Sequence, residues 1–547
     1  MQNVFWADQI AAQTIERAKK ENNIVTCRSG ASPSGSKHIG NLYDVLKSYI
    51  VYKAVKKQNY KARFVLTSDD RDPLRKIPSE LAGLDGMFHK VEDDELKRLK
   101  NYLGVPYVNV PDPFNCCKSW AEHFNRVWLD GIIALGIDDI ELYENDSLYI
   151  QGKFKPYITE ALKNLVMSKK IMKRFQRTLP RDFIPFNPIC EKCGKITAKP
   201  ISFDLDNWTV KYSCKEKELM GKYEVKGCGY KGETSLDNGK LPWRFEWPSQ
   251  WGIFHTTFEA FGKEHYEGSW QSGQDIAKKI YKIEPPIPHV YEFLLINGKK
   301  MSASVGNVFI TQQILEILEP EVFFYFYTKK SKKQRDFDIK HIDRLVNEFD
   351  LAEMVYFGKE TVEDEKEKTN LIRMYESSMQ KIPNQLPLRI PYKFATIVAN
   401  VYQNNLWKKE FIVSKTTELL KTSGIVADKI AKQDKERIYK RILLVNNWIE
   451  KYNPDEKVEI NEKLPEIVLT ENEIKALKKV RDVLDYAKTE EELYNEFYNI
   501  CKSLDMDTKR FFAVMYKILI NNDHGPRLAP FIFAIGRDKI KKLLEGV

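Results

Sequence analysis

Over the first third of the chain, segments with the apolar pattern of strands alternate with segments that have the apolar periodicity of helices. The segments 61–70 (KARFVLTSDD) and 140–146 (IELYEND) carry short apolar runs of the kind that forms strands, and both lead into acidic residues. Helical patterns lie between them, at Leu42–Lys57 and Trp120–Leu135. This alternation predicts an α/β fold with a parallel sheet. Ligands of such sheets bind at the carboxyl ends of the strands, so the acids after residue 68 are candidate site residues.

The residue composition and the apolar pattern change twice further along the chain. Residues 186–238 are rich in Cys, Gly and Lys with short strand patterns, which indicates a small inserted module. Only five of the 26 glycines lie beyond residue 346, where charged amphipathic stretches such as Asp428–Tyr452 and Glu471–Tyr486 dominate. This part is therefore predicted to be all-helical. The predicted segments are the two halves of the α/β domain at 1–185 and 239–345, the insertion at 186–238 and the helical domain at 346–547.

Charge and hydropathy narrow the class of protein only a little. The 547-residue chain carries a formal net charge of +10 and 43% hydrophobic residues, which is compatible with a polyanionic partner and with large cores. We find no apolar run long enough for a membrane span and no apolar signal core in Met1–Lys20, so we expect a cytoplasmic protein without a membrane partner. Eight cysteines in a chain of this length do not indicate a disulfide scaffold.

The segment 31–41 (ASPSGSKHIGN) has the composition of a phosphate-binding turn. It follows the apolar stretch Ile24–Cys27 and leads directly into a predicted helix, whose N-terminus favours an anion. His38 can donate a hydrogen bond to a phosphate oxygen, and Gly40 leaves room for an adenine ring. Taken alone, the segment is better explained by a capped helix behind a flexible turn.

A second segment favours the phosphate-binding interpretation. Residues 294–308 (LLINGKKMSASVGNV) combine a glycine turn, two lysines and Met-Ser-x-Ser, which suits charge that builds up on transferring phosphates. Taken alone, this segment reads as a solvated basic loop.

Together the two segments resemble the signatures of class I aminoacyl-tRNA synthetases. HIGN (38–41) stands where that family has His-x-Gly-His, and KMSAS (300–304) stands where it has Lys-Met-Ser-Lys-Ser. More closely, the chain resembles the class I lysyl-tRNA synthetases. The segments that carry this resemblance are 5–8, 29–41, 68–76, 116–124, 241–251 (LPWRFEWPSQW), 258–265 (FEAFGKEH), 288–293 (PHVYEF) and 525–531 (GPRLAPF).

The resemblance implies a Rossmann-like catalytic domain, a zinc-ribbon-like insertion and a helical anticodon-binding domain. It implies a lysine–tRNA ligase that uses ATP with Mg²⁺, lysine and tRNA(Lys). The residues it implies for catalysis are His38, Lys300 and Ser302. Those implied for ATP are Pro33, His38, Gly40, Asn41, Gly262, Glu264, Lys300 and Met301. Those assigned to lysine are Gly30, Ser32, Asp70, Trp243, His265 and Tyr291.

Several assignments in this set have simpler alternatives. Asp69, Asp70 and Asp72 follow a predicted strand and can receive an amine, or they cap a helix and face solvent. Trp243 and Tyr291 are core aromatics unless the resemblance holds. Burial of an isolated ammonium is costly, so a lysine pocket needs an acid or an aromatic face.

The chain departs from the family pattern at four positions. Ala303 stands at the second lysine of the signature, and Val305 replaces a lysine that members often carry slightly later, so the loop keeps only the lysine pair at 299–300. Trp270 and Gln271 replace Tyr and Asp of a Gly-Ser-Tyr-Asp-Thr-Gly segment. These changes question how strongly the loop assists catalysis.

Four cysteines in the predicted insertion have the spacing of a metal site. Cys190 and Cys193 form a knuckle, and Cys214 and Cys228 follow after gaps of 20 and 13 residues, as if a hairpin had been inserted between the second pair. Four thiolates suit tetrahedral, structural Zn²⁺, and the alternative is free thiols in a degenerate ribbon. Cys116, Cys117 and His123 are a weaker candidate, because adjacent cysteines are poor joint ligands and buried thiols explain them.

The helical part is expected to read the tRNA anticodon through aromatic side chains and basic grooves. Trp407, Phe411 and Arg527 are candidates, although most aromatics of this part are expected in the core. Two other functions stay open: a class I synthetase for another amino acid such as glutamate, whose pocket would carry arginine, and a non-aminoacylating paralogue that binds tRNA or ATP.

Overall fold

A computed structural model of the chain describes residues 4–176, 178–220, 223–301, 308–329, 334–426 and 430–547. These residues form two compact units. The first comprises Met1–Ile314, Phe323–Asp338 and Thr361–Lys381, and the second comprises Leu315–Val322, Ile339–Glu360 and Ile382–Val547. No helix of the described residues is long and apolar enough to cross a membrane.

A five-stranded parallel sheet organises the first unit, as the sequence predicted. Its order is β14 (Ile287–Tyr291), β13 (Phe258–Gly262), β1 (Val25–Ala31), β2 (Ala62–Ser68) and β5 (Glu141–Glu144). The chain adds β2 and β5 on one side of β1 and then β13 and β14 on the other. The strand order therefore reverses at β1, and the carboxyl ends of β1 and β13 open the crevice where such sheets bind ligands.

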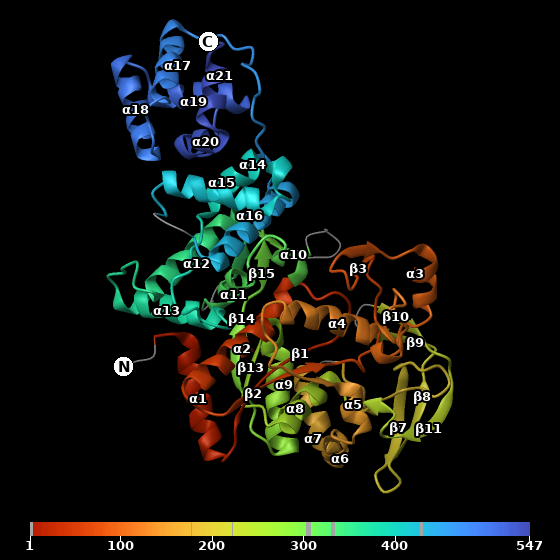
Figure 1. Cartoon of the computed structure of the whole chain (residues 1–547). Coiled ribbons are helices and arrows are strands. Elements are labelled where there is room, and N and C mark those ends of the chain that lie inside the picture. The colour runs from red at the N-terminus through yellow and green to blue at the C-terminus, as the bar shows by residue number, and fades with distance from the viewer. Residues whose placement is uncertain (1–3, 177, 221–222, 302–307, 330–333, 427–429) are drawn as a thin grey trace. The chain divides into compact units, whose positions relative to one another are not determined.

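Helix α2 (Leu42–Lys57) connects β1 to β2 and has the bounds that the sequence predicted. It lies beside β1, β2 and β13, and its residues are buried nearly all round because α1 (Trp6–Lys20) covers its other side (Figure 1). The helices α4 (Trp120–Ile133) and α8 (Trp243–Phe254) belong to the same unit. Helix α13 (Glu365–Ser378) also packs there, because Arg373 forms an ion pair of 2.6 Å with Asp8 of α1.

The predicted insertion contains an antiparallel three-stranded sheet of β7 (Ala198–Asp204), β8 (Thr209–Cys214) and β11 (Lys231–Ser235), coloured yellow in Figure 1. The hairpin β9 (Lys217–Met220) and β10 (Tyr223–Lys226) interrupts it. The short strands β6 (Asn187–Pro188) and β12 (Gly239–Lys240) pair with each other, so the chain returns to the α/β domain where it left it.

An Asn-Gly hairpin carries the basic segment of the first unit. Strands β15 (Leu294–Ile296) and β16 (Lys299–Lys300) pair across Asn297 and Gly298, whose φ angles are 47° and 73°. Both central residues of a type I′ turn need positive φ, which is why Asn-Gly suits this position. Strand β17 (Arg335–Phe337) completes this sheet on the other side of β15.

The second unit is helical throughout its described residues, as predicted. Capping boxes fix two of its helix starts, since Thr470 and Glu473 cap α17 and Thr489 and Glu492 cap α18. Arg441 is buried in its core between Glu319 and Asp350, with nitrogen–oxygen distances of 2.7 Å to each. Its helices are α12 (Ile342–Tyr356), α14 (Tyr392–Val401), α15 (Lys409–Thr422), α16 (Lys432–Tyr452), α17 (Glu471–Val483), α18 (Glu490–Ser503), α19 (Thr508–Ile520), α20 (Leu528–Ile535) and α21 (Arg537–Leu544).

Candidate active site and metal centres

A pocket of about 400 Å³ lies at the carboxyl ends of the central strands. Ser32 follows β1, Asp69 and Asp72 follow β2, His265 follows β13 and Tyr291 ends β14. The residues that line it are Gly30, Ala31, Ser32, Lys37, His38, Gly40, Asn41, Asp44, Asp69, Asp72, Trp243, Glu264, His265, Tyr291, Phe293, Leu294, Lys300 and Met301.

His38 occupies the start of the first helical turn and is held by the backbone there. The amide of Gly40 donates to its Nδ1 at 3.1 Å, and the amide of His38 donates to Oδ1 of Asn41 at 3.1 Å. Because Nδ1 accepts a backbone hydrogen bond, the ring proton belongs on Nε2. Burial, aided by the neighbouring charge of Lys37, lowers the pKa of His38 to about 4. The side chain is therefore a neutral hydrogen-bond donor at pH 7.

Gly40 sits where no side chain fits. A Cβ at this position would lie 2.7 Å from Cε of Met301 and 2.9 Å from the His38 ring. The close approach of Met301 also shows that the end of β16 and the first turn before α2 meet at the pocket. These two segments, far apart in the sequence, are the two that resemble the class I signatures.

Acidic side chains outnumber basic ones on the pocket wall. Asp44, Asp69, Asp72 and Glu264 line it, against Lys37 and Lys300, and no arginine does so among the described residues. Asp44 accepts a hydrogen bond of 2.5 Å from the Tyr291 hydroxyl, and burial raises the pKa of Asp44 to about 8. A bound cation would favour the ionised form of this carboxyl.

Aromatic rings form another wall. Trp243 stacks on Trp247 with a centroid distance of 5.2 Å and an interplanar angle of 13°, and the His265 ring lies 6.3 Å from Trp243. Burial lowers the pKa of His265, although the charge of Glu264 opposes the shift. The wall therefore offers ring faces and a neutral imidazole.

A buried charged pair lies beneath the pocket. Arg28 on β1 and Glu259 on β13 are 2.5 Å apart between Nη1 and Oε1, with side chains 1% and 5% exposed. The indoles of Trp247 and Trp251 donate to the same carboxylate at 3.0 and 2.8 Å. Since Glu259 holds its guanidinium, Arg28 has no free charge to offer an anionic ligand.

Asp69 and Asp72 are fixed by this polar layer. Asp69 accepts hydrogen bonds of 2.9 Å from the side-chain amides of Asn145 and Gln250. Asp72 forms an ion pair with Lys240, which also lies 2.7 Å from Glu246. Both carboxylates are therefore held by side chains of the protein itself.

Three residues predicted for the site do not line the pocket. Pro33 is buried, and its carbonyl accepts a hydrogen bond of 2.8 Å from the Trp120 indole. Gly262 ends β13 opposite Tyr291 of β14, and of these two residues only Tyr291 lines the pocket. Asp70 is buried and accepts a hydrogen bond of 2.8 Å from the backbone amide of Asp146, so its neighbours Asp69 and Asp72 face the pocket in its place.

Ser302, Ala303 and Val305 lie outside the described residues. Of the other unusual positions, Trp270 is 2% exposed and stacks on Phe261 at 4.6 Å, and Gln271 is exposed. Neither lines the pocket.

Sequence reasoning missed Lys37, Asp44 and Phe293, which all line the pocket. Asp44 follows Gly40 by four residues, a spacing that places two helical residues on one face. This spacing could have identified Asp44 as a site residue once Gly40 had been assigned to the site. Lys37 directly precedes His38, but nothing in the local pattern shows which way its side chain runs.

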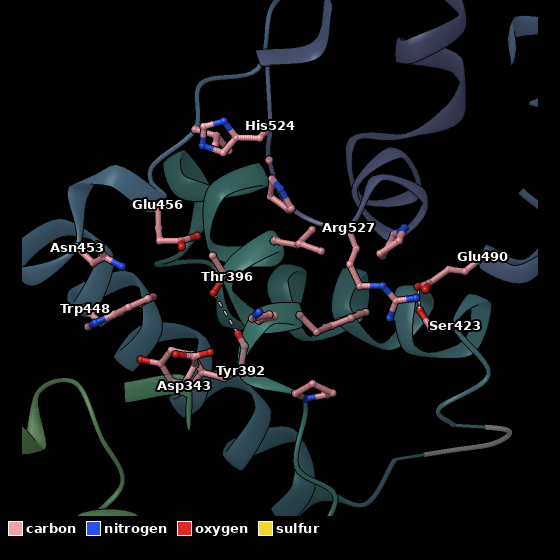
Figure 2. A pocket seen from close by; sticks show the side chains of 18 of the residues that line it. Asp343, Tyr392, Thr396, Ser423, Trp448, Asn453, Glu456, Glu490, His524 and Arg527 are labelled. Atoms are coloured by element: carbon pink, nitrogen blue, oxygen red, sulfur yellow. Dashed lines mark hydrogen bonds between the residues drawn. The ribbon is translucent and has the colours of Figure 1, made fainter. Parts of the chain in front are cut away.

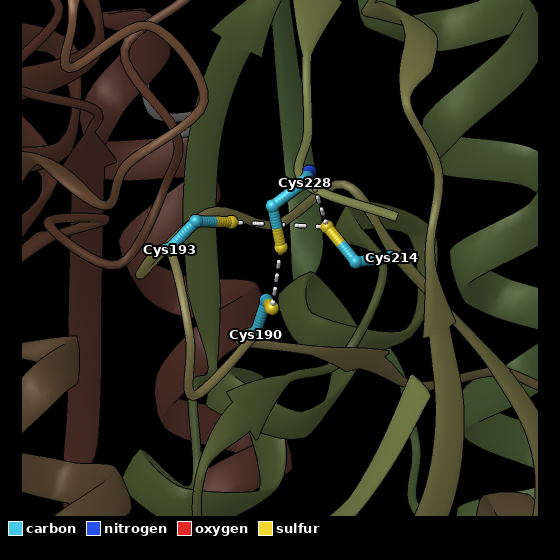
Figure 3. Close-up of side chains that lie close together, drawn as sticks. All are labelled: Cys190, Cys193, Cys214 and Cys228. Atoms are coloured by element: carbon cyan, nitrogen blue, oxygen red, sulfur yellow. Dashed lines mark hydrogen bonds between the residues drawn. The ribbon is translucent and has the colours of Figure 1, made fainter. Parts of the chain in front are cut away.

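Four cysteines of the insertion converge, as Figure 3 shows. Sγ of Cys190 lies 3.6 Å from Sγ of Cys228, Sγ of Cys193 lies 3.7 Å from Sγ of Cys214, and all four lie within 4.8 Å of one another. Four thiolates about 2.3 Å from one Zn²⁺ would stand about 3.8 Å apart, so the arrangement fits a tetrahedral ion. The hairpin of β9 and β10 lies between Cys214 and Cys228, as their spacing predicted.

A second cluster contains Asp112, Cys116, Cys117 and His123, whose ligand atoms also lie within 4.8 Å of one another. Nε2 of His123 lies 2.9 Å from the Ala82 carbonyl, which assigns the ring proton to Nε2 and leaves Nδ1 for the cluster. Cys116 is exposed rather than a buried thiol. Adjacent cysteines therefore do share a cluster here, with a buried carboxylate and an imidazole beside them.

The helical unit contains a larger pocket of about 1140 Å³. Figure 2 shows Arg527, Glu490, Tyr392, Trp448 and His524 around it. Arg527 lies over the ring of Tyr494 at 5.6 Å, and it directly precedes helix α20, so it both lines the pocket and starts a helix. Trp407 and Phe411, also predicted for RNA, are 76% and 38% exposed but do not line this pocket.

Comparison with known proteins identifies the family of this chain. The family model described as "tRNA synthetases class I (K)" matches residues 4–381. The lysine–tRNA ligase of Natronomonas pharaonis is 36% identical over 532 residues, which cover 97% of this chain and 95% of that protein. Those of Haloarcula marismortui and Methanocaldococcus jannaschii are each 34% identical and cover 98% of this chain, with 95% and 98% of their own lengths.

The family match spans more than half of the chain, and the relatives align along nearly all of it. The resemblance seen in the two signature segments is thereby confirmed. This chain belongs to the class I (K) family of tRNA synthetases.

Proposed function

We propose that this protein is a lysine–tRNA ligase. In the first step, a carboxylate oxygen of lysine bonds to the α-phosphorus of ATP, and the bond to the β-bridging oxygen breaks to release pyrophosphate. In the second step, a hydroxyl of the terminal ribose of tRNA(Lys) bonds to the acyl carbon, and AMP leaves. Both steps depend mainly on positioning and on stabilisation of charge.

The charge of the pocket carries this proposal. Four carboxylates face two lysines, so the pocket favours an amino acid with a cationic side chain. A glutamate side chain would need a cationic pocket, yet Arg28 is held by Glu259 and the two lysines of the wall are outnumbered by its carboxylates. The relatives named above carry the same activity in their names.

The assignment of residues follows from their places on the wall. His38, Gly40, Asn41, Lys300 and Met301 approach one another where two signatures meet, so we assign them to ATP. We assign Gly30, Ser32, Trp243, His265 and Tyr291 to lysine, with Asp69 and Asp72 in place of Asp70. Glu264 directly precedes His265 and lines the same pocket, and we assign it to ATP. Ser302 stays a prediction for the loop.

Metal ions have two distinct roles in this proposal. Mg²⁺ arrives with the phosphates of ATP and needs few protein ligands. Zn²⁺ held by Cys190, Cys193, Cys214 and Cys228 would have four ligands and no place for water, so its role is structural. Asp112 and His123 are buried and lie beside Cys116 and Cys117. These four residues form a separate cluster that can hold a second Zn²⁺.

We assign the larger pocket of the helical unit to tRNA. Single-stranded RNA is recognised through splayed bases that stack on aromatic rings or guanidinium planes. Arg527 over Tyr494 is such a surface. Lys340, Arg344 and Lys393 also line the pocket and can contact phosphates, although five carboxylates stand beside them. A cytoplasmic location follows from a role in translation.

The decisive experiment is amino-acid-dependent exchange of pyrophosphate into ATP, with lysine and glutamate in parallel and tRNA in separate tubes. We expect exchange with lysine and none with glutamate. Exchange with glutamate alone would replace the substrate and keep the fold. Failure of every amino acid, with and without tRNA, would favour a paralogue that binds tRNA or ATP without aminoacylation.

A further inference from the structure

Lys37 brings an ammonium to the active-site pocket without an ion pair. It directly precedes His38, lines the pocket and is half-buried. Its Nζ donates to the backbone carbonyl of Ser32, and no carboxylate of the described residues forms an ion pair with it. Lys240, by comparison, is buried against Asp72 and Glu246.

In the free protein, the ammonium of Lys37 loses its proton more easily than an ordinary lysine does. Burial lowers the pKa of Lys37 to about 8, although Asp69, Asp44 and Asp72 act in the opposite direction. Lys37 in turn helps to lower the pKa of His38. At pH 7 the lysine is therefore the cation of this pair and the histidine is the neutral donor. An anion bound beside Lys37 would stabilise its charged form.

The pocket has a need for such a cation. Departure of pyrophosphate places growing negative charge on the phosphate oxygens, and fixed cations stabilise that charge. Lys300 is the other lysine on the wall, and it lies on the hairpin of β15 and β16. The sequence that follows it, from Met301 to Val308, contains no basic residue. Lys299, its neighbour on β16, is exposed and does not line the pocket, so a second cation on the wall comes from another segment.

We infer that Lys37 is this second cation: it binds the phosphates of ATP together with Lys300 and stabilises the charge that develops on departing pyrophosphate. The inference rests on the proposed function and adds a catalytic residue to it. Lys37 acts only in the first step, in which it contacts the phosphates of bound ATP and of the departing pyrophosphate. It has no role when the acyl group moves to tRNA, since no pyrophosphate is present then.

The first test compares the two half-reactions in Lys37→Met, Lys37→Arg and the matched control Lys278→Met, an exposed lysine of the same unit. Loss of one preorganised donor costs about 100-fold in kcat or more. We expect Lys37→Met to lose about 100-fold in pyrophosphate exchange and to transfer lysine from added lysyl-adenylate to tRNA at the normal rate. Equal loss in both half-reactions, or a rise confined to the KM for lysine, would overturn the inference.

The second test uses pH. The charged form of Lys37 in the free protein is lost above about pH 8, so kcat/KM for ATP in the exchange reaction, which reports the free enzyme, should fall there in the wild type. Lys37→Arg keeps its charge and should extend activity to higher pH. Asp44, which also titrates near pH 8, remains in this variant, so it cannot explain a difference between the two proteins. Identical alkaline limbs would contradict the role of Lys37.

Binding separates this inference from the proposed function. Calorimetry with ATP and Mg²⁺, and separately with pyrophosphate, needs no amino acid and no turnover. If the wild type fails in exchange but binds ATP, the proposed function fails, and weaker binding by Lys37→Met still supports the inference. Equal binding by the wild type and Lys37→Met, or no binding by either, overturns it.

Discussion

Replacement of Glu259 by glutamine tests the buried charge beneath the active site. Glu259 accepts three hydrogen bonds, from Arg28 and from the indoles of Trp247 and Trp251. Glutamine has the same shape but only one oxygen, so its amide group would face a donor, and Arg28 would keep a buried charge without a counter-ion. Removal of one member of a buried ion pair destabilises a protein by about 3–5 kcal/mol.

The expected loss of unfolding free energy corresponds to a shift in Tm that depends on the size of the first unit. The unfolding entropy of a unit this large corresponds to about 2 °C of Tm, or slightly less, for each kcal/mol. The Glu259→Gln variant should therefore unfold about 4–10 °C below the wild type. Differential scanning calorimetry resolves the transition of this unit.

Glu16→Gln is the matched control, since Glu16 pairs with Lys20 at 2.8 Å while both side chains are about 70% exposed. Exposed pairs contribute little, so this variant should keep the Tm of the wild type. An unchanged Tm for Glu259→Gln, or equal shifts for the two variants, would refute the reasoning that the Arg28 charge depends on Glu259.

Three further predictions follow from particular contacts. Cys193→Ser should lower the zinc content by one ion per chain in elemental analysis, whereas Cys501→Ser, outside both metal clusters, should keep it; equal zinc in both variants would contradict the site. Gly40→Val should reduce kcat/KM for ATP by about 100-fold, because its side chain has no room, and an unchanged KM for ATP would exclude this. Arg441→Met should destabilise the helical unit by about 3–5 kcal/mol, and added Glu319→Gln should recover part of the loss; additive losses would count against the pair.

Much of the fold was predictable because it follows from local periodicity. The runs at 61–70 and 140–146 become β2 and β5, and the predicted helix Leu42–Lys57 is α2 without adjustment. The predicted helix at Glu471–Tyr486 ends slightly earlier, at Val483. Strands and helices differ in the period of their apolar residues, and that period is written in consecutive positions. The two signature motifs could be recognised because each consists of consecutive residues.

The site could be predicted only in part, because the direction of a side chain depends on distant contacts. Asp69, Asp70 and Asp72 are equivalent in the sequence, yet Asp70 turns to the amide of Asp146 while the other two reach the pocket. Lys37 faces the pocket only because the loop before α2 folds back on Ser32.

The sequence by itself determined the α/β and helical parts, the two signatures and the cluster of four cysteines. The tertiary structure alone decided the charge of the pocket. Arg28 and Glu259 are 231 residues apart, and their pairing neutralises an arginine that would otherwise suit an anionic substrate. No local pattern encodes such a pair, because it forms only when β1 and β13 become neighbours in the sheet.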